Sequence, residues 1–252
     1  MAHRFYIDGG LTEPTCELTD SEAHHLIHVM RGKPGDRVEL FDGRGAAAAA
    51  EITEVKRNTV ELRIHATTSE DDDATSRVIL ATAVPKGDRF RWLVEKATEL
   101  GVSRLIPVNT THSVVAPKTG KLDKMQQTVI AACKQCGRNR LMKIDEPRDW
   151  QSLVEREFPG ANVLVADPSG EDLQLVTSTT PAGDQILVVG PEGGLTDMEI
   201  SIAHDAGAAI VKLGKHILRI ETAAISLIAA NSAKLRMRPT DQLGDRFPDQ
   251  VS

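Results

Sequence analysis

The segment LVVGPEGGLTDMEI, residues 187–200, predicts a strand, a loop and a helix in direct succession. It opens with an apolar run rich in valine, which is typical of a buried strand. Three glycines follow within residues 190–194, and glycine tolerates positive φ angles and lets a ligand approach the backbone closely. Thr196 and Glu199 then have the spacing of a capping box, which fixes the start of a helix.

A second segment, VKLGKHILRIETAAISLIAA at residues 211–230, repeats this order. An apolar strand runs into Gly214, and a helix is expected from about residue 222. Loops at the carboxyl ends of parallel strands form the ligand sites of α/β proteins. We therefore expect the two loops to lie side by side at one edge of a parallel sheet and to line a ligand site.

Neither loop has the signature of a known phosphate-binding motif. The glycines at residues 190–194 are not followed by the Lys-Ser or Lys-Thr pair of a P-loop, and the Rossmann spacing G-x-G-x-x-G is missing. The motifs therefore argue against nucleoside triphosphates and dinucleotides as ligands. A purely structural turn remains the alternative for either loop taken alone.

The composition is that of an ordinary globular protein with one large or two modest domains. The 252 residues are 40% hydrophobic and 26% charged. The first ten residues lack an apolar signal core, and no run approaches the roughly 18 apolar residues of a membrane span. Three cysteines are too few for a disulfide framework. We expect a cytoplasmic protein that has no membrane partner.

The polar, acidic segment at residues 67–76 is the expected linker between two domains. Before it, alternating apolar runs separated by turn residues predict a small β-barrel, with strands at residues 4–7, 37–41, 47–55 and 59–64. One helix at residues 21–30 is expected among them, with Leu26, Val29 and Met30 facing inward.

After the linker, strands and helices alternate, which predicts a parallel α/β sheet. The expected strands lie at residues 78–84, 105–108, 163–166, 186–189 and 209–213. The expected helices lie at residues 88–100, 122–136, 197–206 and 222–236.

Two clusters of possible metal ligands have structural interpretations. Cys133 and Cys136 have C-x-x-C spacing but lie on the apolar stripe at the end of a helix, which favours buried structural thiols over a redox or zinc site. His24, His25 and His28 lack the H-E-x-x-H spacing, so packing or RNA contact is favoured over metal binding. We therefore predict no metal.

Positive charge is concentrated in the middle of the chain. Residues 76–149 carry 14 Lys and Arg against 7 Asp and Glu, although the whole chain has a net charge of −6. Within them, KQCGRNR at residues 134–140 combines cations and amides, which can contact phosphates and base edges. The segment therefore indicates a polyanion site, with a solvated, salt-bridged surface as the alternative.

Together these segments resemble the small-subunit (16S) ribosomal RNA uridine-N3 methyltransferase family of the SPOUT superfamily. The resemblance covers nearly the whole chain and is carried by HHLIHVMRGKPGDRVELFDG at 24–43, PKGDRFRWLVEKATELGVSRLIPV at 85–108, AACKQCGRNR at 131–140, and the two loop segments. Each motif alone is weak evidence, but their combination and order are specific.

The resemblance implies a PUA-like β-barrel at residues 1–70 that binds RNA, and a SPOUT α/β domain at residues 76–240 with a C-terminal trefoil knot. It also implies a homodimer that binds S-adenosylmethionine. By position, the cofactor residues would be Ala166, Asp167, Gly190, Pro191, Glu192, Gly193, Gly194, Leu213, Gly214, Ile217, Leu218 and Arg219.

The implied reaction is methylation of N3 of a uridine in small-subunit rRNA, either as free rRNA or in the assembled subunit. Catalysis needs a base for the N3 proton or a cation for the developing charge. Arg138 and Arg219 are the candidate cations, and Glu221 or Glu192 the candidate base. The candidate RNA contacts are Arg31, Lys86, Arg89, Lys134, Arg138, Asn139 and Arg140.

The chain departs from the family pattern at a few positions. Lys215 and His216 replace the usual Pro-Arg, Ile220 replaces a Thr, and Leu141-Met142 stands where a proline is common. Two alternatives therefore stay open. One is methylation of another RNA position such as a ribose 2′-hydroxyl, and the other is a non-catalytic RNA-binding ribosome assembly factor.

Overall fold

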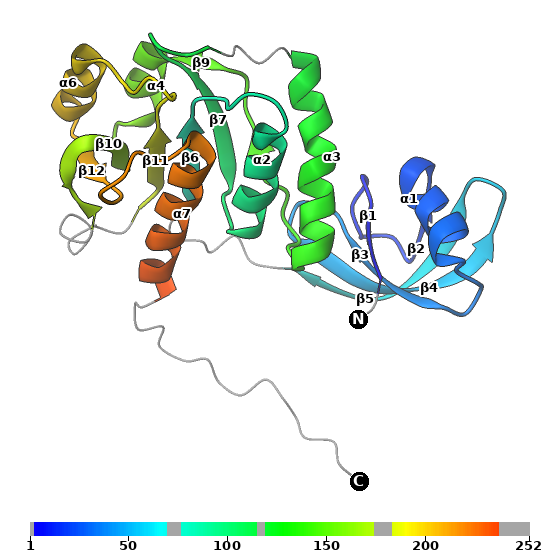
Figure 1. The fold of residues 1–252 in the computed structure, drawn as a ribbon. Helices are drawn as coiled ribbons and strands as arrows, with labels where there is room; N and C mark the ends of the chain where they lie inside the picture. Colours follow the sequence, from blue (N-terminus) through cyan, green and yellow to red (C-terminus); the bar gives the residue numbers. More distant parts are fainter. Residues whose placement is uncertain (1–2, 70–76, 115–118, 174–182, 237–252) are drawn as a thin grey trace.

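The computed structural model describes residues 3–69, 77–114, 119–173 and 183–236 (Figure 1). They form a small N-terminal sheet beside a larger parallel sheet that has helices on both faces. No helix in this part of the chain is both long and apolar enough to cross a membrane.

The N-terminal sheet has the strand order β1-β3-β4-β5-β2. Its strands are β1 (Arg4–Tyr6), β2 (Thr15–Leu18), β3 (Arg37–Phe41), β4 (Ala46–Val55) and β5 (Val60–Ser69). β1 pairs parallel with β3, and the other neighbours are antiparallel. Within the described residues, β1 and β2 are the two edges, so the sheet is half of a barrel. The expected linker begins later than predicted because β5 continues to Ser69, and residues 70–76 lie outside the described ranges.

The expected N-terminal helix consists of α1 (Asp20–His24) followed by the π-helical segment η1 (His25–Met30). Leu26 is buried as predicted, whereas Val29 is 61% exposed, so the inward prediction for Val29 was wrong. The i→i+5 bonding of a π-helix changes the angle between successive side chains and rotates Val29 away from the α-helical stripe. Met30 is partly buried and packs against the same core as Leu26, as predicted, so of the three residues only Val29 departs from the expected face.

The larger sheet confirms the expected parallel α/β arrangement. Its order is β12-β10-β11-β6-β7-β8, and β9 also pairs with β7. Every pairing in it is parallel. The strands are β6 (Val78–Thr82), β7 (Arg104–Asn109), β8 (Lys143–Ile144), β9 (Arg148–Asp149), β10 (Asn162–Asp172), β11 (Gln185–Val189) and β12 (Ala209–Lys212).

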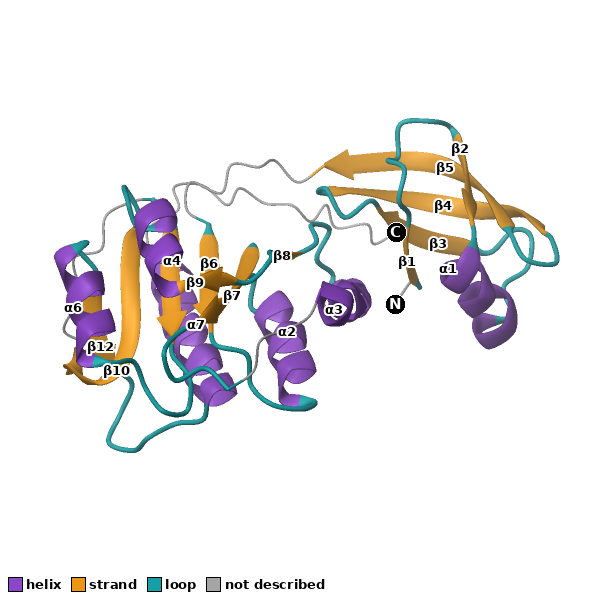
Figure 2. Cartoon of the chain, turned by 90° about the horizontal axis from the view of Figure 1, so that it is seen from above, coloured by secondary structure: helices purple, strands orange, loops and turns teal. Residues whose placement is uncertain are grey.

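Helices cover both faces of this sheet and bury two apolar cores (Figure 2). α2 (Arg89–Glu99), α3 (Thr119–Cys136) and α7 (Ile220–Arg236) lie on one face, and α4 (Trp150–Glu157) and α6 (Asp197–Asp205) lie on the other. Phe90 and Leu227 are fully buried in the first core, and Leu153 in the second. Each large apolar side chain stabilises the fold by about 2 kcal/mol when it is buried.

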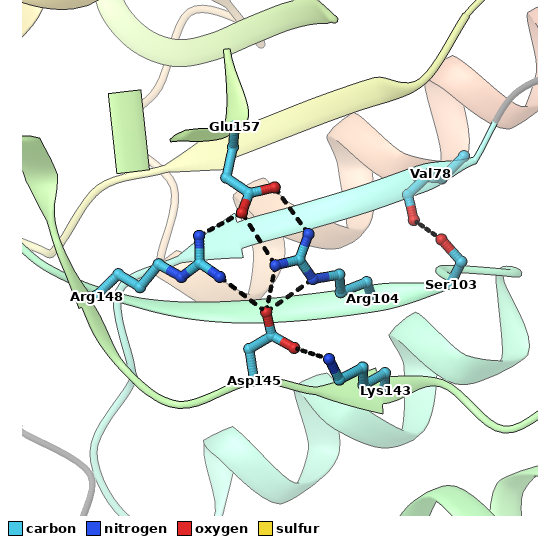
Figure 3. Close-up of polar contacts among 7 residues, drawn as sticks. All are labelled: Val78, Ser103, Arg104, Lys143, Asp145, Arg148 and Glu157. Atoms are coloured by element: carbon cyan, nitrogen blue, oxygen red, sulfur yellow. Dashed lines mark hydrogen bonds and ion pairs between the residues drawn. The ribbon is translucent and has the colours of Figure 1, made fainter. Parts of the chain in front are cut away.

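A charged cluster holds the edge of the sheet where β7, β8, β9 and α4 meet (Figure 3). The guanidinium of Arg104 donates to Asp145 Oδ2 and to Glu157 Oε2, both at 2.7 Å. Arg148 contacts the same two carboxylates. Burial opposes the charged form of Asp145 and Glu157, but the hydrogen bonds from Arg104 outweigh it and hold the pKa of each carboxyl below its ordinary value.

Candidate functional site

A cavity of about 800 Å³ lies at the carboxyl ends of β10, β11 and β12. Its walls come from three segments, at residues 166–172, 189–195 and 212–223. The sequence suggested that the loops after β11 and β12 are adjacent; in the structure β10 lies between those strands, and its own C-terminal half completes the wall. The volume falls within the range of about 300–1,000 Å³ that small-molecule sites occupy.

Most of the residues proposed to bind a cofactor line this cavity. They are Ala166, Asp167, Gly190, Pro191, Glu192, Gly193, Gly194, Leu213, Gly214, Ile217 and Leu218. The resemblance assigned cofactor residues only at positions that match the family motifs, so it missed other residues of the cavity wall. These are Pro168, Ser169, Asp172, Val189, Leu195, Lys212, Lys215, His216, Ile220 and Ala223. The departures from the family pattern at positions 215, 216 and 220 are therefore part of the cavity wall.

The glycine-rich loop after β11 needs its glycines for two different reasons. Gly194 has a φ of 75°, in the left-handed region, and its N–H donates to the carbonyl of Pro191 at 2.9 Å. At Gly193, a Cβ would stand 3.0 Å from the Cβ of His112, so the loop after β7 packs directly on its backbone. A side chain at either position would disturb the wall of the cavity.

The other two walls, from β10 and from the loop after β12, supply a fixed turn and an apolar surface. Asp167 Oδ1 accepts hydrogen bonds from the N–H and the hydroxyl of Ser169, at 2.9 and 2.6 Å. Ile217 lines the cavity and is 87% exposed, which is unusual for a large aliphatic side chain. Such a side chain offers apolar contact area to a flat ligand.

The predicted capping box is present at the start of α6. Thr196 and Glu199 exchange side-chain to backbone hydrogen bonds, and Glu199 Oε1 also accepts from the N–H of Thr111 at 2.9 Å. Burial opposes the charged form of Glu199, but these backbone hydrogen bonds lower its pKa below the ordinary value. The buried carboxylate therefore ties the loop after β7 to the end of the glycine-rich loop.

Arg89, proposed as an RNA contact, joins two segments of the site. Its guanidinium lies 3.5 Å from Glu192 Oε1 and 3.7 Å from Glu221 Oε1. Glu221 is buried at the start of α7 and faces Arg89, whereas Ile220 and Ala223 of the same helix line the cavity. Arg89 therefore connects the N-terminal end of α2 to the glycine-rich loop and to α7.

The three proposed catalytic residues do not meet at the cavity. Of the described residues that line it, none is Arg138, Arg219 or Glu221. Arg219 is exposed at the start of α7. Arg138 Nη1 donates to the carbonyls of Val102 and Thr98, at 2.7 and 3.1 Å, and so caps the end of α2.

Replacing Arg138 by Met is expected to lower the free energy of unfolding by about 1–3 kcal/mol, because buried carbonyls at the end of α2 lose a charged donor. Arg138→Lys should retain part of this stability through one hydrogen bond. Denaturant titration of the two variants and the wild type measures the difference. Equal stability of all three would assign Arg138 a role other than capping.

The KQCGRNR segment joins the two sheets. Lys134 Nζ lies 2.8 Å from Glu22 Oε2, and Arg4 donates to the carbonyl of Cys133 at 3.0 Å and to the side chain of Asn139. The Lys134 side chain is only 19% exposed. These two proposed RNA contacts, Lys134 and Asn139, therefore have partners within the chain, because α1 supplies the acid and β1 supplies the arginine.

The remaining proposed RNA contacts lie nearer the surface. Arg31 and Lys86 are exposed, and Arg140 forms isolated β-bridges with Gly43 and Arg44, which lie between β3 and β4. Their role in RNA binding stays a prediction.

The two cysteines at the end of α3 differ from each other. Cys133 is buried as predicted, and burial raises the pKa of its thiol to about 11. Cys136 is exposed, so the prediction of a second buried thiol was wrong. The helix ends at Cys136, and Gly137 follows with a φ of 82°, which turns the chain away from the apolar stripe.

Comparison with known proteins identifies the family. Residues 72–232 match the model of the RNA methyltransferase domain, and residues 18–64 match that of the RNA methyltransferase PUA domain. The chain is 31% identical over 240 residues to ribosomal RNA small subunit methyltransferase E of Bacillus subtilis, covering 91% of this chain and 94% of that protein.

Solved structures of similar proteins share the fold. Ribosomal RNA small subunit methyltransferase E of Neisseria gonorrhoeae, bound to S-adenosyl methionine, superposes with a TM-score of 0.84 at 31% identity, covering 93% of this chain and 98% of that one. A methyltransferase from Legionella pneumophila in complex with the cofactor SAM gives 0.82 at 28% identity, with the same coverage of 93% and 98%. The predicted fold class, a SPOUT-type α/β domain with a small N-terminal β domain, is confirmed. The chain therefore belongs to the RNA methyltransferase family that includes ribosomal RNA small subunit methyltransferase E.

Proposed function

We propose that the protein transfers a methyl group from S-adenosylmethionine to N3 of a uridine in 16S ribosomal RNA. The observation that carries the proposal is the cavity formed by the C-terminal half of β10 and the loops after β11 and β12. It lies in a chain of the RNA methyltransferase family, and similar proteins from Legionella pneumophila and Neisseria gonorrhoeae have structures with S-adenosylmethionine bound.

The residues of the cavity suit this cofactor. Leu213, Ile217 and Leu218 supply an apolar wall for an adenine ring, and the glycines at 190–194 leave backbone groups accessible for the ribose and the ring edge. When bound, S-adenosylmethionine supplies a methyl group on a sulfonium, which is already an activated donor.

Uridine N3 carries an imide proton, so the enzyme must accept that proton or stabilise the charge left behind. Both carboxylates considered as the base lie within 3.7 Å of Arg89, but Glu192 lines the cavity with 42% of its side chain exposed, whereas Glu221 is 10% exposed and is not one of the lining residues. We therefore assign Glu192 as the base that accepts the N3 proton. Arg219, exposed beside the wall, is the proposed cation for the developing charge. Because N3 lies on the Watson–Crick edge, the uridine must be unpaired or flipped out.

The same proposal assigns roles to the two domains and to the oligomer. Residues 1–70 would bind RNA as a PUA-like domain, and residues 76–240 would carry the SPOUT methyltransferase activity and its trefoil knot. The exposed cations Arg31 and Lys86 are the surface candidates for the RNA backbone. The protein would act as a homodimer in the cytoplasm, on free rRNA or on the assembled small subunit.

Nucleoside analysis of rRNA tests the proposal. We expect 3-methyluridine to be absent from 16S rRNA of a strain that lacks the gene, and to return when the purified protein and S-adenosylmethionine are added to its rRNA or small subunits. Persistence of 3-methyluridine without the gene would refute the assigned position. Failure to bind S-adenosylmethionine at high micromolar concentration would refute the enzymatic function altogether.

A further inference from the structure

The loop after β7 is in direct contact with the glycine-rich loop of the cavity. His112 Nδ1 lies 3.1 Å from the carbonyl oxygen of Gly193 and 3.1 Å from that of Gly194. His112 is 81 and 82 positions away from these glycines in the sequence. It is neither one of the cavity-lining residues nor part of the motifs that carry the family resemblance.

This contact fixes the tautomer of the histidine. A carbonyl oxygen has lone pairs but no proton, so it can only accept a hydrogen bond. Nδ1 must therefore carry the proton that both carbonyls share, and of the two neutral tautomers only the one with Nε2 as the acceptor fits this contact. The alternative tautomer would place the lone pair of Nδ1 against two oxygens.

The position of His112 is itself determined by the fold. Its neighbour Thr111 donates to the buried carboxylate of Glu199 through the N–H at 2.9 Å and the hydroxyl at 3.1 Å. Thr110 and Ser113 close the turn, with the Ser113 N–H donating to the Thr110 carbonyl at 3.0 Å. The hydrogen bonds of its neighbours in the loop after β7 therefore hold the imidazole of His112 against the glycine-rich loop.

The peptide unit between Gly193 and Gly194 is fixed at both of its polar ends. His112 binds its carbonyl, and its N–H donates to the carbonyl of Pro191 at 2.9 Å. Rotation of this unit would exchange the backbone groups that the loop presents to the cavity. Glycine has no side chain to resist such a rotation, so the restraint must come from outside the loop.

We propose that His112 is a positioning residue that, as the Nδ1–H tautomer, fixes the peptide units at Gly193 and Gly194 in the conformation that binds the cofactor. The effect on S-adenosylmethionine rests on the proposed function, whereas the tautomer and the restraint of the loop do not.

Three variants of the full-length protein separate hydrogen bonding from packing. Asn places its amide N–H close to the position of histidine Nδ1, and Gln places it close to Nε2. His112→Asn is expected to bind S-adenosylmethionine within about threefold of the wild type. His112→Gln and His112→Ala are expected to bind about tenfold more weakly, because the glycine carbonyls lose their donor. Equal affinity in all three variants, or equal loss in all three, would overturn the proposal.

Two measurements do not depend on the cofactor. A proton–nitrogen correlation spectrum of the imidazole rings, with His112 assigned by its disappearance in His112→Asn, should show the Nδ1–H tautomer; the Nε2–H tautomer would refute the geometry. Amide exchange at Gly194 should be about tenfold faster in His112→Ala than in His112→Asn. If these results hold but the wild type binds no S-adenosylmethionine, the proposed function fails and the assignment of His112 as the loop restraint stands.

Discussion

Replacing Glu192 by Gln is expected to lower kcat for uridine methylation by about 10²–10⁴-fold, which is the usual contribution of a general base. Glutamine preserves the size and shape of the side chain but does not accept the N3 proton. The affinity for S-adenosylmethionine should stay within about threefold of the wild type, because the glycine backbone and the apolar wall are unchanged. Single-turnover methylation and cofactor titration measure the two quantities separately.

Two control variants test the choice of carboxylate. Asp197→Asn removes an exposed acid five positions along the same segment and should leave kcat unchanged. Glu221→Gln removes the buried partner of Arg89 and should mainly reduce stability, since Glu221 faces α2 and is not one of the cavity-lining residues. A larger loss of kcat in Glu221→Gln than in Glu192→Gln, at equal stability, would contradict the assignment of the base.

The local signals in the sequence predicted much of the site. The apolar run, the glycines and the Thr196–Glu199 capping box are patterns between near neighbours, and the structure contains the strand, loop and helix that they indicate. The same is true of α2, whose apolar stripe at Phe90, Leu93 and Val94 is buried. Such patterns are readable because the period of each element is imposed by backbone geometry.

The contacts between distant segments could not be predicted in this way. Lys134 and Asn139 suggested an RNA surface, but their partners Glu22 and Arg4 lie more than 100 positions earlier, with separations of 112 and 135. A cation in a sequence looks the same whether it meets a phosphate or a carboxylate of the same chain. His112 was missed for a related reason, because its role depends on the backbone carbonyls of a loop 81 positions away.

The helix at the N-terminus shows a different limit. Val29 fits an α-helical stripe with Leu26, yet the chain forms a π-helix from His25 to Met30 and exposes it. The hydrophobic pattern gives the face of a helix only when the helix keeps its usual period. A change in hydrogen bonding from i→i+4 to i→i+5 leaves no mark in composition.

The second large effect is expected in the charged cluster of Figure 3. Replacing Arg104 by Met should lower the free energy of unfolding at pH 7 by about 3 kcal/mol, because it leaves Asp145 and Glu157 buried without their main donor. The side chains of these acids are only 7% and 12% exposed, so water replaces little of the lost interaction. Arg148 still contacts both of them, which keeps the loss below that of a fully unpaired buried charge.

The loss of stability in Arg104→Met should become smaller as the pH falls. In the wild type, the pKa values of Asp145 and Glu157 lie below their ordinary values of about 4, so the stabilisation is complete above pH 4–5 and is lost as the pH falls through the lower values of the folded protein. In Arg104→Met, both carboxyls can be neutral at low pH, and a neutral carboxyl no longer needs the guanidinium. The difference in unfolding free energy between wild type and variant should therefore shrink towards about pH 3.

Arg156→Met is the matched control, because Arg156 is exposed on the same helix, α4, next to Glu157. It should change stability by no more than about 0.5 kcal/mol at any pH. Urea titrations of the three proteins between about pH 3 and pH 7 measure the differences. A constant deficit of Arg104→Met across this range would mean that the packing of the whole Arg104 side chain, rather than its charge, holds β7 against α4. A deficit that disappears with acid would assign the stability of this edge to the paired carboxylates.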